Sequence, residues 1–340
     1  MVERSRGLDI ACHGLLILGG LLVCLPIYFA FVVGSHTVRD VLAVPPPWLP
    51  GTEFFENAQT AWQKGNLGRL LFNSLVVAVG ITVGKIAVSL LSAFAISYFR
   101  FRYRMTAFWL IFVSLMLPVE VRILPTYEAV ANVALPLQWM VDMLDVGRWI
   151  GALTGTRVEI GLEWNMMNSY GGLILPLIAS ATATFLFRQF YLTLPEELCE
   201  AARIDGASPL RFFWHVLLPL SVSNMAALAI ILFLYGWNQY LWPLLFTTDK
   251  SMATAVIGLK HLIPQSDAEP AWNVAMNAAL LVMLPRCWSW WRCSAGSSRA
   301  WSTAASRSPT PWSSSSVIAG HATCGPRTAW TAFAARASSA

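Results

Sequence analysis

Long apolar runs separated by short charged stretches dominate the amino-acid sequence. A helix that spans a membrane needs about 20 mostly apolar residues. Five segments carry such runs and a sixth begins as one, and together they predict an all-α polytopic membrane protein with one transmembrane domain over residues 1–285. The predicted spans are about 8–34, 70–98, 105–124, 171–190, 217–246 and a sixth that starts at 273 and loses its helical pattern at 285.

The first apolar segment follows Arg4 and Arg6, which is also how a signal peptide begins. It is longer than the apolar core of a signal peptide, and no cleavage site of small residues precedes the polar loop after it. We therefore expect it to remain as a spanning helix.

The composition supports a membrane protein and excludes several other classes. Of the 340 residues, 56% are hydrophobic and 12% are charged, whereas a soluble domain carries about 25% charged residues. Disordered, collagenous and disulfide-rich secreted proteins do not have this composition. The six cysteines form no CxxC pair, and no histidine stands at metal-ligand spacing from them, so no zinc site is predicted. The formal net charge of +5 is too dilute to indicate nucleic-acid binding.

Basic residues close to the spans predict the orientation of the chain. Arg4 and Arg6 precede the first span, three arginines at 100–104 separate the second from the third, and the basic stretch 188–211 follows the fourth. These flanks fall on one side if the spans alternate, so we expect a cytoplasmic N-terminus. The loops expected to face outward are 35–69, 125–170 and 247–272, and the second of these is expected to form short interfacial helices.

Residues 192–221, between the fourth and fifth spans, do not have the composition of a plain loop. Their pattern predicts two short amphipathic helices, with a break around Gly206 and Ser208. Glycine permits a positive φ at such a break, and serine before proline begins a new helix. Ala201 and Ala202 lack bulky side chains, so that face of the first helix can approach another surface closely.

This segment resembles the EAA motif of ABC importer permeases. Glu200-Ala201-Ala202 is followed by three residues, Gly206, nine residues, and then Val216-x-Leu218-Pro219. The family pattern has isoleucine where this chain has Val216. We call residues 192–221 the EAA segment.

Three further stretches, 116–132, 180–213 and 235–246, resemble the second permease of carbohydrate-type importers. Within that family they are most similar to permeases of sn-glycerol-3-phosphate importers. The resemblance covers roughly 10–285, apart from about 133–163, which looks like an insertion. It implies the fold of a type I importer permease in a bacterial inner membrane. The implied solute is sn-glycerol-3-phosphate or a related glycerophosphodiester.

The resemblance also implies partners and a coupling site. The expected partners are a second permease subunit, two copies of a cytoplasmic ATP-binding subunit, an extracytoplasmic solute-binding protein and membrane lipid. ATP and Mg²⁺ are expected on the ATP-binding subunit, so this chain is expected to be no enzyme and to bind no cofactor. The implied coupling residues are Glu200, Ala201, Ala202 and Gly206, with Leu218 and Pro219 fixing where the fifth span leaves the segment.

Polar residues within the spans are candidates for a solute pathway. Lys85 lies in the second span, and an ionisable residue there normally faces protein or water. It could attract an anionic solute, or it could be a structural lysine bonded to a carbonyl. Asn224, Asn238 and Gln239 in the fifth span could line the pathway or bond neighbouring helices. Arg122 and Arg188 are explained as well by snorkelling at span ends.

The run Gly80–Lys85 is not a phosphate-binding loop, because its spacing is one residue short and no serine or threonine follows the lysine. No Ser/His/Asp arrangement or paired carboxylate lies within a span, so an intramembrane enzyme is not indicated. A permease for another sugar or polyol remains open, as does a membrane receptor or scaffold that transports nothing.

Residues 286–340 have a different character from the rest. They contain six tryptophans and six arginines but no lysine or acidic residue, and the 285 residues before them have a net charge of −1. Disordered tails are poor in aromatic residues. Reading the implied codons one base out of register converts Cys-Trp to Leu and Trp-Trp to Val. That frame yields an apolar span with a basic flank, so we predict a single-base frameshift close to Pro285, which resequencing would test.

Overall fold

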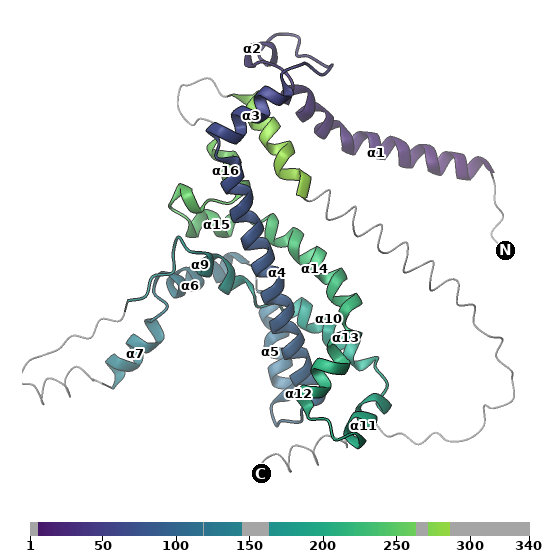
Figure 1. Cartoon of the computed structure of the whole chain (residues 1–340), viewed down its shortest axis with the longest axis vertical. Coiled ribbons are helices and arrows are strands. Elements are labelled where there is room, and N and C mark those ends of the chain that lie inside the picture. Colours follow the sequence, from purple (N-terminus) through teal and green to yellow (C-terminus); the bar gives the residue numbers. More distant parts are fainter. Residues whose placement is uncertain (1–5, 118, 145–162, 263–270, 286–340) are drawn as a thin grey trace, which may run out of the picture. The chain divides into compact units, whose positions relative to one another are not determined.

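The computed structural model describes residues 6–117, 119–144, 163–262 and 271–285, and every regular element in those ranges is a helix (Figure 1). The chain divides into two compact units. The described residues of the terminal unit lie within Met1–Leu75 and Thr248–Trp288, and those of the central unit lie within Val76–Thr247. The predicted frameshift tail lies outside the described residues.

The terminal unit brings the two ends of the described chain together. Its core is a small apolar cluster that includes Ala61, Leu70, Ile257 and Ala278. The elements are α1 (Arg6–Gly34), α2 (Val38–Val41), α3 (Phe54–Lys64), the first turns of α4 (Leu67–Tyr98), the 3₁₀ turn η3 (Lys250–Met252), α16 (Ala255–His261) and the helix Trp272–Pro285.

Buried amides fasten the helices of this unit to one another. The Asn57 side chain donates to the carbonyls of Gly34 at 3.0 Å and His36 at 2.9 Å. Asn273 donates to the Asn57 side chain at 2.8 Å. Asn277 donates to the carbonyls of Gly34 at 3.2 Å and Phe54 at 2.8 Å. The helix Trp272–Pro285 is therefore tied by hydrogen bonds to the end of α1 and the start of α3.

The central unit has an aromatic core, which includes Phe94, Phe187, Tyr191, Phe212 and Phe213. The elements are the remainder of α4, α5 (Arg104–Met116), α6 (Val119–Ala131), α7 (Leu135–Met143), α9 (Tyr170–Ile174), the 3₁₀ turn η1 (Leu175–Leu177), α10 (Ala181–Leu192), α11 (Glu197–Ile204), α12 (Pro209–Phe212), the π-helical turn η2 (Phe213–Leu217), α13 (Leu218–Leu220), α14 (Val222–Trp237) and α15 (Leu241–Phe246).

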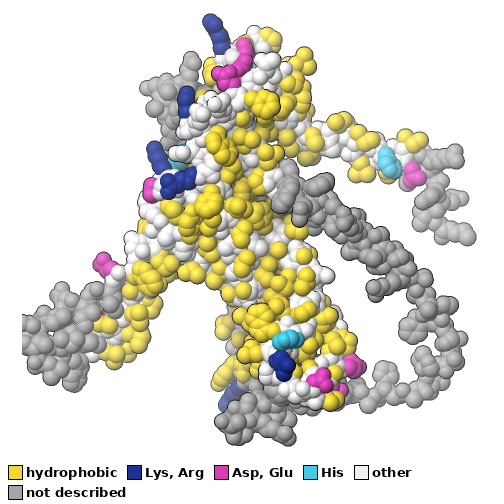
Figure 2. All heavy atoms as spheres, viewed as in Figure 1, with side chains coloured by type: hydrophobic (Ala, Val, Ile, Leu, Met, Phe, Trp, Pro, Cys, Tyr) yellow, Lys and Arg dark blue, Asp and Glu magenta, His cyan; other side chains and the backbone are white. Residues whose placement is uncertain are grey.

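Two predicted spans are confirmed as continuous apolar helices of spanning length, over Asp9–Gly34 and Leu67–Tyr98. The first of them is only 11% buried, and Figure 2 shows hydrophobic side chains over most of the visible surface of the described elements. Such a surface suits lipid or another apolar protein rather than water.

The third predicted span, 105–124, is wrong as a single helix, because α5 ends at Met116 and α6 begins at Val119. Leu117 is extended, with a ψ of 124°. It precedes Pro118, and the proline ring disfavours a helical conformation in the residue before it.

The fourth and fifth predicted spans are bent or broken. Tyr170–Leu177 and Ala181–Leu192 meet at 48°. Pro209–Leu220 and Val222–Trp237 meet at 70°, and α14 ends at Trp237 rather than continuing to 246. The sixth predicted span is a helix over Trp272–Pro285, and the residues after it lie outside the described part.

The predicted insertion 133–163 contains α7, whose apolar side chains are largely exposed, Trp139 by 66% and Met143 by 71%. Residues 145–162 of that segment lie outside the described ranges. Its placement at the outer membrane surface stays a prediction.

Candidate functional site

The EAA segment forms the two predicted short helices. Helix α11 has Glu197 and Glu200 in its first turn and Arg203 in its last, an arrangement that complements the helix dipole. The Ser208 hydroxyl accepts a hydrogen bond from the Arg211 amide and caps α12, as the sequence predicts.

Gly206 terminates α11 in a left-handed conformation, with a φ of +70°. The Gly206 amide donates to the carbonyl of Arg203 at 2.9 Å, and the Ala207 amide donates to that of Ala202 at 2.8 Å. These two bonds make a Schellman motif, in which a residue with positive φ closes the helix. The positive φ that the sequence predicts at this break is confirmed.

Helix α11 has one packed face and one open face. Cys199 and Ala202 pack against the aromatic core, whereas Glu200 and Ala201 are exposed. Ile204, at the end of the helix, is 86% exposed. Figure 2 shows acidic side chains gathered where α11 lies in Figure 1. The open face thus combines small, acidic and apolar groups, which is suitable for docking another protein.

Leu218 and Pro219 lie at the sharp bend before α14. Proline has no amide hydrogen and cannot donate to the carbonyl four residues earlier, so it kinks a helix. At the bend, the amide of Ser221 donates to the carbonyl of Leu217 at 3.0 Å, and its hydroxyl donates to the same carbonyl at 2.6 Å. The structure places these two residues just before the bend into α14, and their role in fixing where the long helix leaves the EAA segment stays a prediction.

The aromatic core connects this segment to the longer helices of the central unit. The rings of Phe94 on α4 and Phe213 on η2 lie 5.0 Å apart, and those of Tyr98 and Phe212 lie 5.6 Å apart. Phe212 and Phe213 are almost fully buried. Close-packed interiors transmit strain, so these contacts provide a physical connection between the EAA segment and α4.

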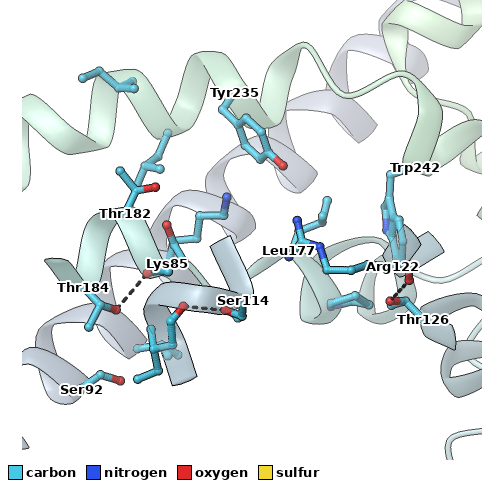
Figure 3. A pocket seen from close by; sticks show the side chains of 18 of the residues that line it. Lys85, Ser92, Ser114, Arg122, Thr126, Leu177, Thr182, Thr184, Tyr235 and Trp242 are labelled. Carbon is cyan, nitrogen blue, oxygen red and sulfur yellow. Dashed lines mark hydrogen bonds between the residues drawn. The ribbon is translucent and has the colours of Figure 1, made fainter. Parts of the chain in front are cut away.

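A cavity of about 520 Å³ lies elsewhere in the central unit (Figure 3). Several helices form its walls. The residues that line it include Lys85 on α4 and Arg122 on α6. Figure 3 shows these two cationic groups extending from opposite sides toward the same space, with Tyr235 above it. No aspartate or glutamate is among the described residues that line the cavity.

Lys85 is 7% exposed, and its Nζ atom lies 3.8 Å from the centre of the Tyr235 ring. A charge near the middle of a spanning helix costs about 3 kcal/mol or more. Contact with an aromatic face contributes only about 0.5–2 kcal/mol. The contact with Tyr235 therefore offsets only part of the cost of burying this cation.

Hydroxyl groups supply further polar atoms to the cavity. Those of Ser114, Thr126 and Thr184 donate to the backbone carbonyls of Ile111, Arg122 and Ser180, at 2.6, 2.6 and 2.9 Å. Each hydroxyl oxygen keeps lone pairs that can accept a hydrogen bond from a ligand.

The other candidates for the solute pathway, on the predicted fifth span, do not lie in the cavity with Lys85. Asn238 is exposed at the end of α14, and Gln239 donates to the Tyr235 carbonyl at 3.3 Å. Asn224 is half-buried in the first turn of α14. None of the three lines the cavity, and their place in a solute pathway stays a prediction. The sequence analysis explained Arg122 by snorkelling at a span end. In the structure it lines the cavity together with Lys85, so it joins the candidate site residues.

Within the described residues, no group of three histidine, cysteine, aspartate or glutamate side chains could hold a metal ion.

Comparison with known proteins places the chain among transport components. A family model described as binding-protein-dependent transport system inner membrane component matches residues 64–285. The sn-glycerol-3-phosphate transport system permease protein UgpE of Yersinia enterocolitica is 50% identical over 291 residues, which cover 84% of this chain and 92% of that protein. The proteins of the same name from Salmonella typhi and Pectobacterium atrosepticum are each 49% identical over the same length and coverage.

The fold is that of a solved bacterial ABC transporter involved in the import of the acidic polysaccharide alginate. The TM-score is 0.67 at 17% sequence identity, and the match covers 86% of this chain and 98% of the solved one.

Proposed function

Because the chain belongs to the family of binding-protein-dependent transport system inner membrane components, we propose that it is one permease subunit of an ATP-driven importer of sn-glycerol-3-phosphate or a related glycerophosphodiester. The observation that carries the solute is the identity of about half of all aligned residues with permeases of that name. The ABC permease fold supports the membrane-embedded part of the proposal.

We propose that α11 is the coupling helix that docks on the ATP-binding subunit. Its exposed Glu200 would meet a basic group of that subunit, and Ala201 would allow close approach. Ala202 faces the aromatic core, and its carbonyl accepts the hydrogen bond that closes the turn at Gly206. Leu218 and Pro219 would set the angle at which a displacement of α11 passes into α14.

The remaining parts of the assembly follow from this role. A second permease subunit, two copies of the ATP-binding subunit and an extracytoplasmic binding protein would complete the importer. ATP and Mg²⁺ would bind to the ATP-binding subunits, so this chain would catalyse no reaction and bind no cofactor. The EAA segment and the N-terminus would face the cytoplasm, and Asn224 on α14 and Asn238 and Gln239 just after it would border the pathway.

Transport by the assembled importer tests the proposed function. The full chain is co-expressed with its partner subunits and reconstituted into vesicles that contain ATP, with the binding protein outside. We expect uptake of sn-glycerol-3-phosphate or its diesters and no uptake of neutral sugars or polyols. Uptake of a neutral sugar alone would contradict the proposed solute.

Co-purification separates a permease from a receptor or scaffold that needs no ATPase. We expect the ATP-binding subunit to co-purify with the full chain, and combined Glu200→Arg and Gly206→Val substitutions to abolish that association. Association that survives both substitutions would contradict docking through α11.

A further inference from the structure

The cavity around Lys85 holds two cationic groups without a carboxylate among its described lining residues. Lys85 cannot be explained as a lysine that snorkels to an interface, because it lies well inside the 32-residue helix α4 and is 7% exposed. Its Nζ atom meets the Tyr235 ring, which contributes less than burial of the charge costs. An intramembrane charge of this kind normally marks a substrate or ion pathway.

The cationic and hydroxyl groups that line the cavity favour a phosphate ester as its ligand. A phosphate monoester carries a charge of about −1.5 to −2 at pH 7, which two cationic groups can neutralise. Arginine can bind phosphate oxygens through two parallel hydrogen bonds, and lysine contributes a compact charge. Hydroxyl oxygens of Ser114, Thr126 and Thr184 can accept hydrogen bonds from alcohol groups of the same solute. The volume of about 520 Å³ is within the range of small-molecule sites.

The position of Tyr235 completes the arrangement. Figure 3 shows its ring over the space into which Lys85 and Arg122 extend. The ring holds the Lys85 ammonium group on one side, and the phosphate would approach this group from the cavity side. The buried Leu232 on α14 also lines this space, and an apolar group beside the charges lowers the local dielectric constant and strengthens their attraction to a phosphate.

We propose that this cavity is a solute-binding site of the permease, in which Lys85 and Arg122 bind the phosphate of a phosphate monoester during its passage. The proposal rests on the proposed function and adds to it the place, the residues and the ligand group. It assigns solute recognition to this subunit in addition to any recognition by the binding protein.

The test compares two solutes in the reconstituted importer, with loaded binding protein at saturation. One solute is sn-glycerol-3-phosphate, a monoester, and the other is a glycerophosphodiester, whose phosphate carries a single negative charge. The variants are Lys85→Gln, Lys85→Arg and Arg122→Gln. Lys64→Gln is the matched control, because it removes an exposed lysine on α3 that lies outside the cavity.

We expect Lys85→Gln and Arg122→Gln each to lower monoester uptake by about 10-fold or more, the loss that follows from one charged hydrogen bond. Uptake of the diester is expected to fall less, because its single charge needs one cation. Lys85→Arg should restore most of the monoester uptake, and Lys64→Gln should match the unchanged protein.

Unchanged monoester uptake by Lys85→Gln would overturn the proposal. So would an equal loss for both solutes without recovery in Lys85→Arg, since that result indicates a structural lysine. If Lys85→Gln does not assemble with the ATP-binding subunit, the exposed Arg122 carries the test by the same criteria. Failure of the unchanged importer to take up either ester would contradict the proposed function itself, a result distinct from failure of the variants alone.

Discussion

The side-chain amide of Asn277 donates a hydrogen bond to the carbonyl of Gly34 at a point where the two backbones almost touch. The hydrogen bond is 3.2 Å long, and a Cβ atom on Gly34 would lie 3.2 Å from the Asn277 backbone nitrogen. The end of α1 and the helix Trp272–Pro285 therefore meet through a glycine and an amide. Small residues and buried amides are typical contacts between helices in a membrane.

Asn277→Leu is expected to destabilise the terminal unit. It removes the donors to Gly34 and Phe54 and leaves both carbonyls without that partner, at a cost of about 1–3 kcal/mol. The apparent melting temperature of the purified chain in detergent should fall. The matched control is Asn238→Leu, at an exposed position at the end of α14, which should melt like the unchanged protein. Equal melting of the two variants would contradict this account.

Substitutions of Gly206 should show whether backbone conformation or side-chain size is the constraint at this position. No atom lies within 4 Å of a Cβ built there, so the φ of +70° is the constraint. Gly206→Asn should preserve coupling, because asparagine adopts this conformation more readily than other residues with a side chain. Gly206→Val should keep membrane insertion but lower transport per ATP hydrolysed. The measurement is uptake and ATPase activity in the same vesicles, and normal transport by Gly206→Val would refute the assignment.

Gly236→Ala tests the close contact of α14 with α4. A Cβ atom there would lie 3.0 Å from the Ala78 Cα, so the helices must separate slightly. We expect a loss of about 1–3 kcal/mol and a lower melting temperature. Gly19→Ala is the matched control, since it also lies in an apolar helix but has no atom within 4 Å of its Cβ position. The idea fails if both variants melt alike.

Ile204→Ser tests docking through the open face of α11. Ile204 is 86% exposed, so its replacement should leave melting unchanged. Loss of an apolar anchor should weaken association by about 10-fold, which a titration with purified ATP-binding subunit would measure. Leu42→Ser, at a position 51% exposed beside α2, serves as the control and should leave affinity unchanged. An unchanged affinity in Ile204→Ser would place docking elsewhere.

Local signals in the sequence were sufficient for the EAA segment. Gly206 and Ser208 act through their own backbone and near neighbours, so their roles in ending α11 and capping α12 can be read from a few residues. The break at Leu117 also has a local signal in the sequence, namely the proline that follows it. A long hydropathy window averages over such a proline, which is why one span was predicted there.

The cavity could not be predicted in the same way. Lys85 was visible as a charge in an apolar run, but its pairing with Arg122 depends on how α4 and α6 pack. Arg122 is separated from Lys85 by the whole of α5, and periodicity along one helix carries no information about such a neighbour. Glu120 lies two residues before Arg122 in the sequence, so sequence neighbours do not indicate that Arg122 lines a cavity with Lys85.

Leu232 is part of both the cavity wall and the aromatic core against which α11 packs. Binding free energies at two linked sites are reciprocal, so a factor that one ligand imposes on the other applies in both directions. If docking of the ATP-binding subunit shifts this core and changes solute affinity, an occupied cavity must change the affinity for that subunit by the same factor. Solute bound in the permease would then change how tightly the ATP-binding subunit docks, in addition to any effect of the loaded binding protein.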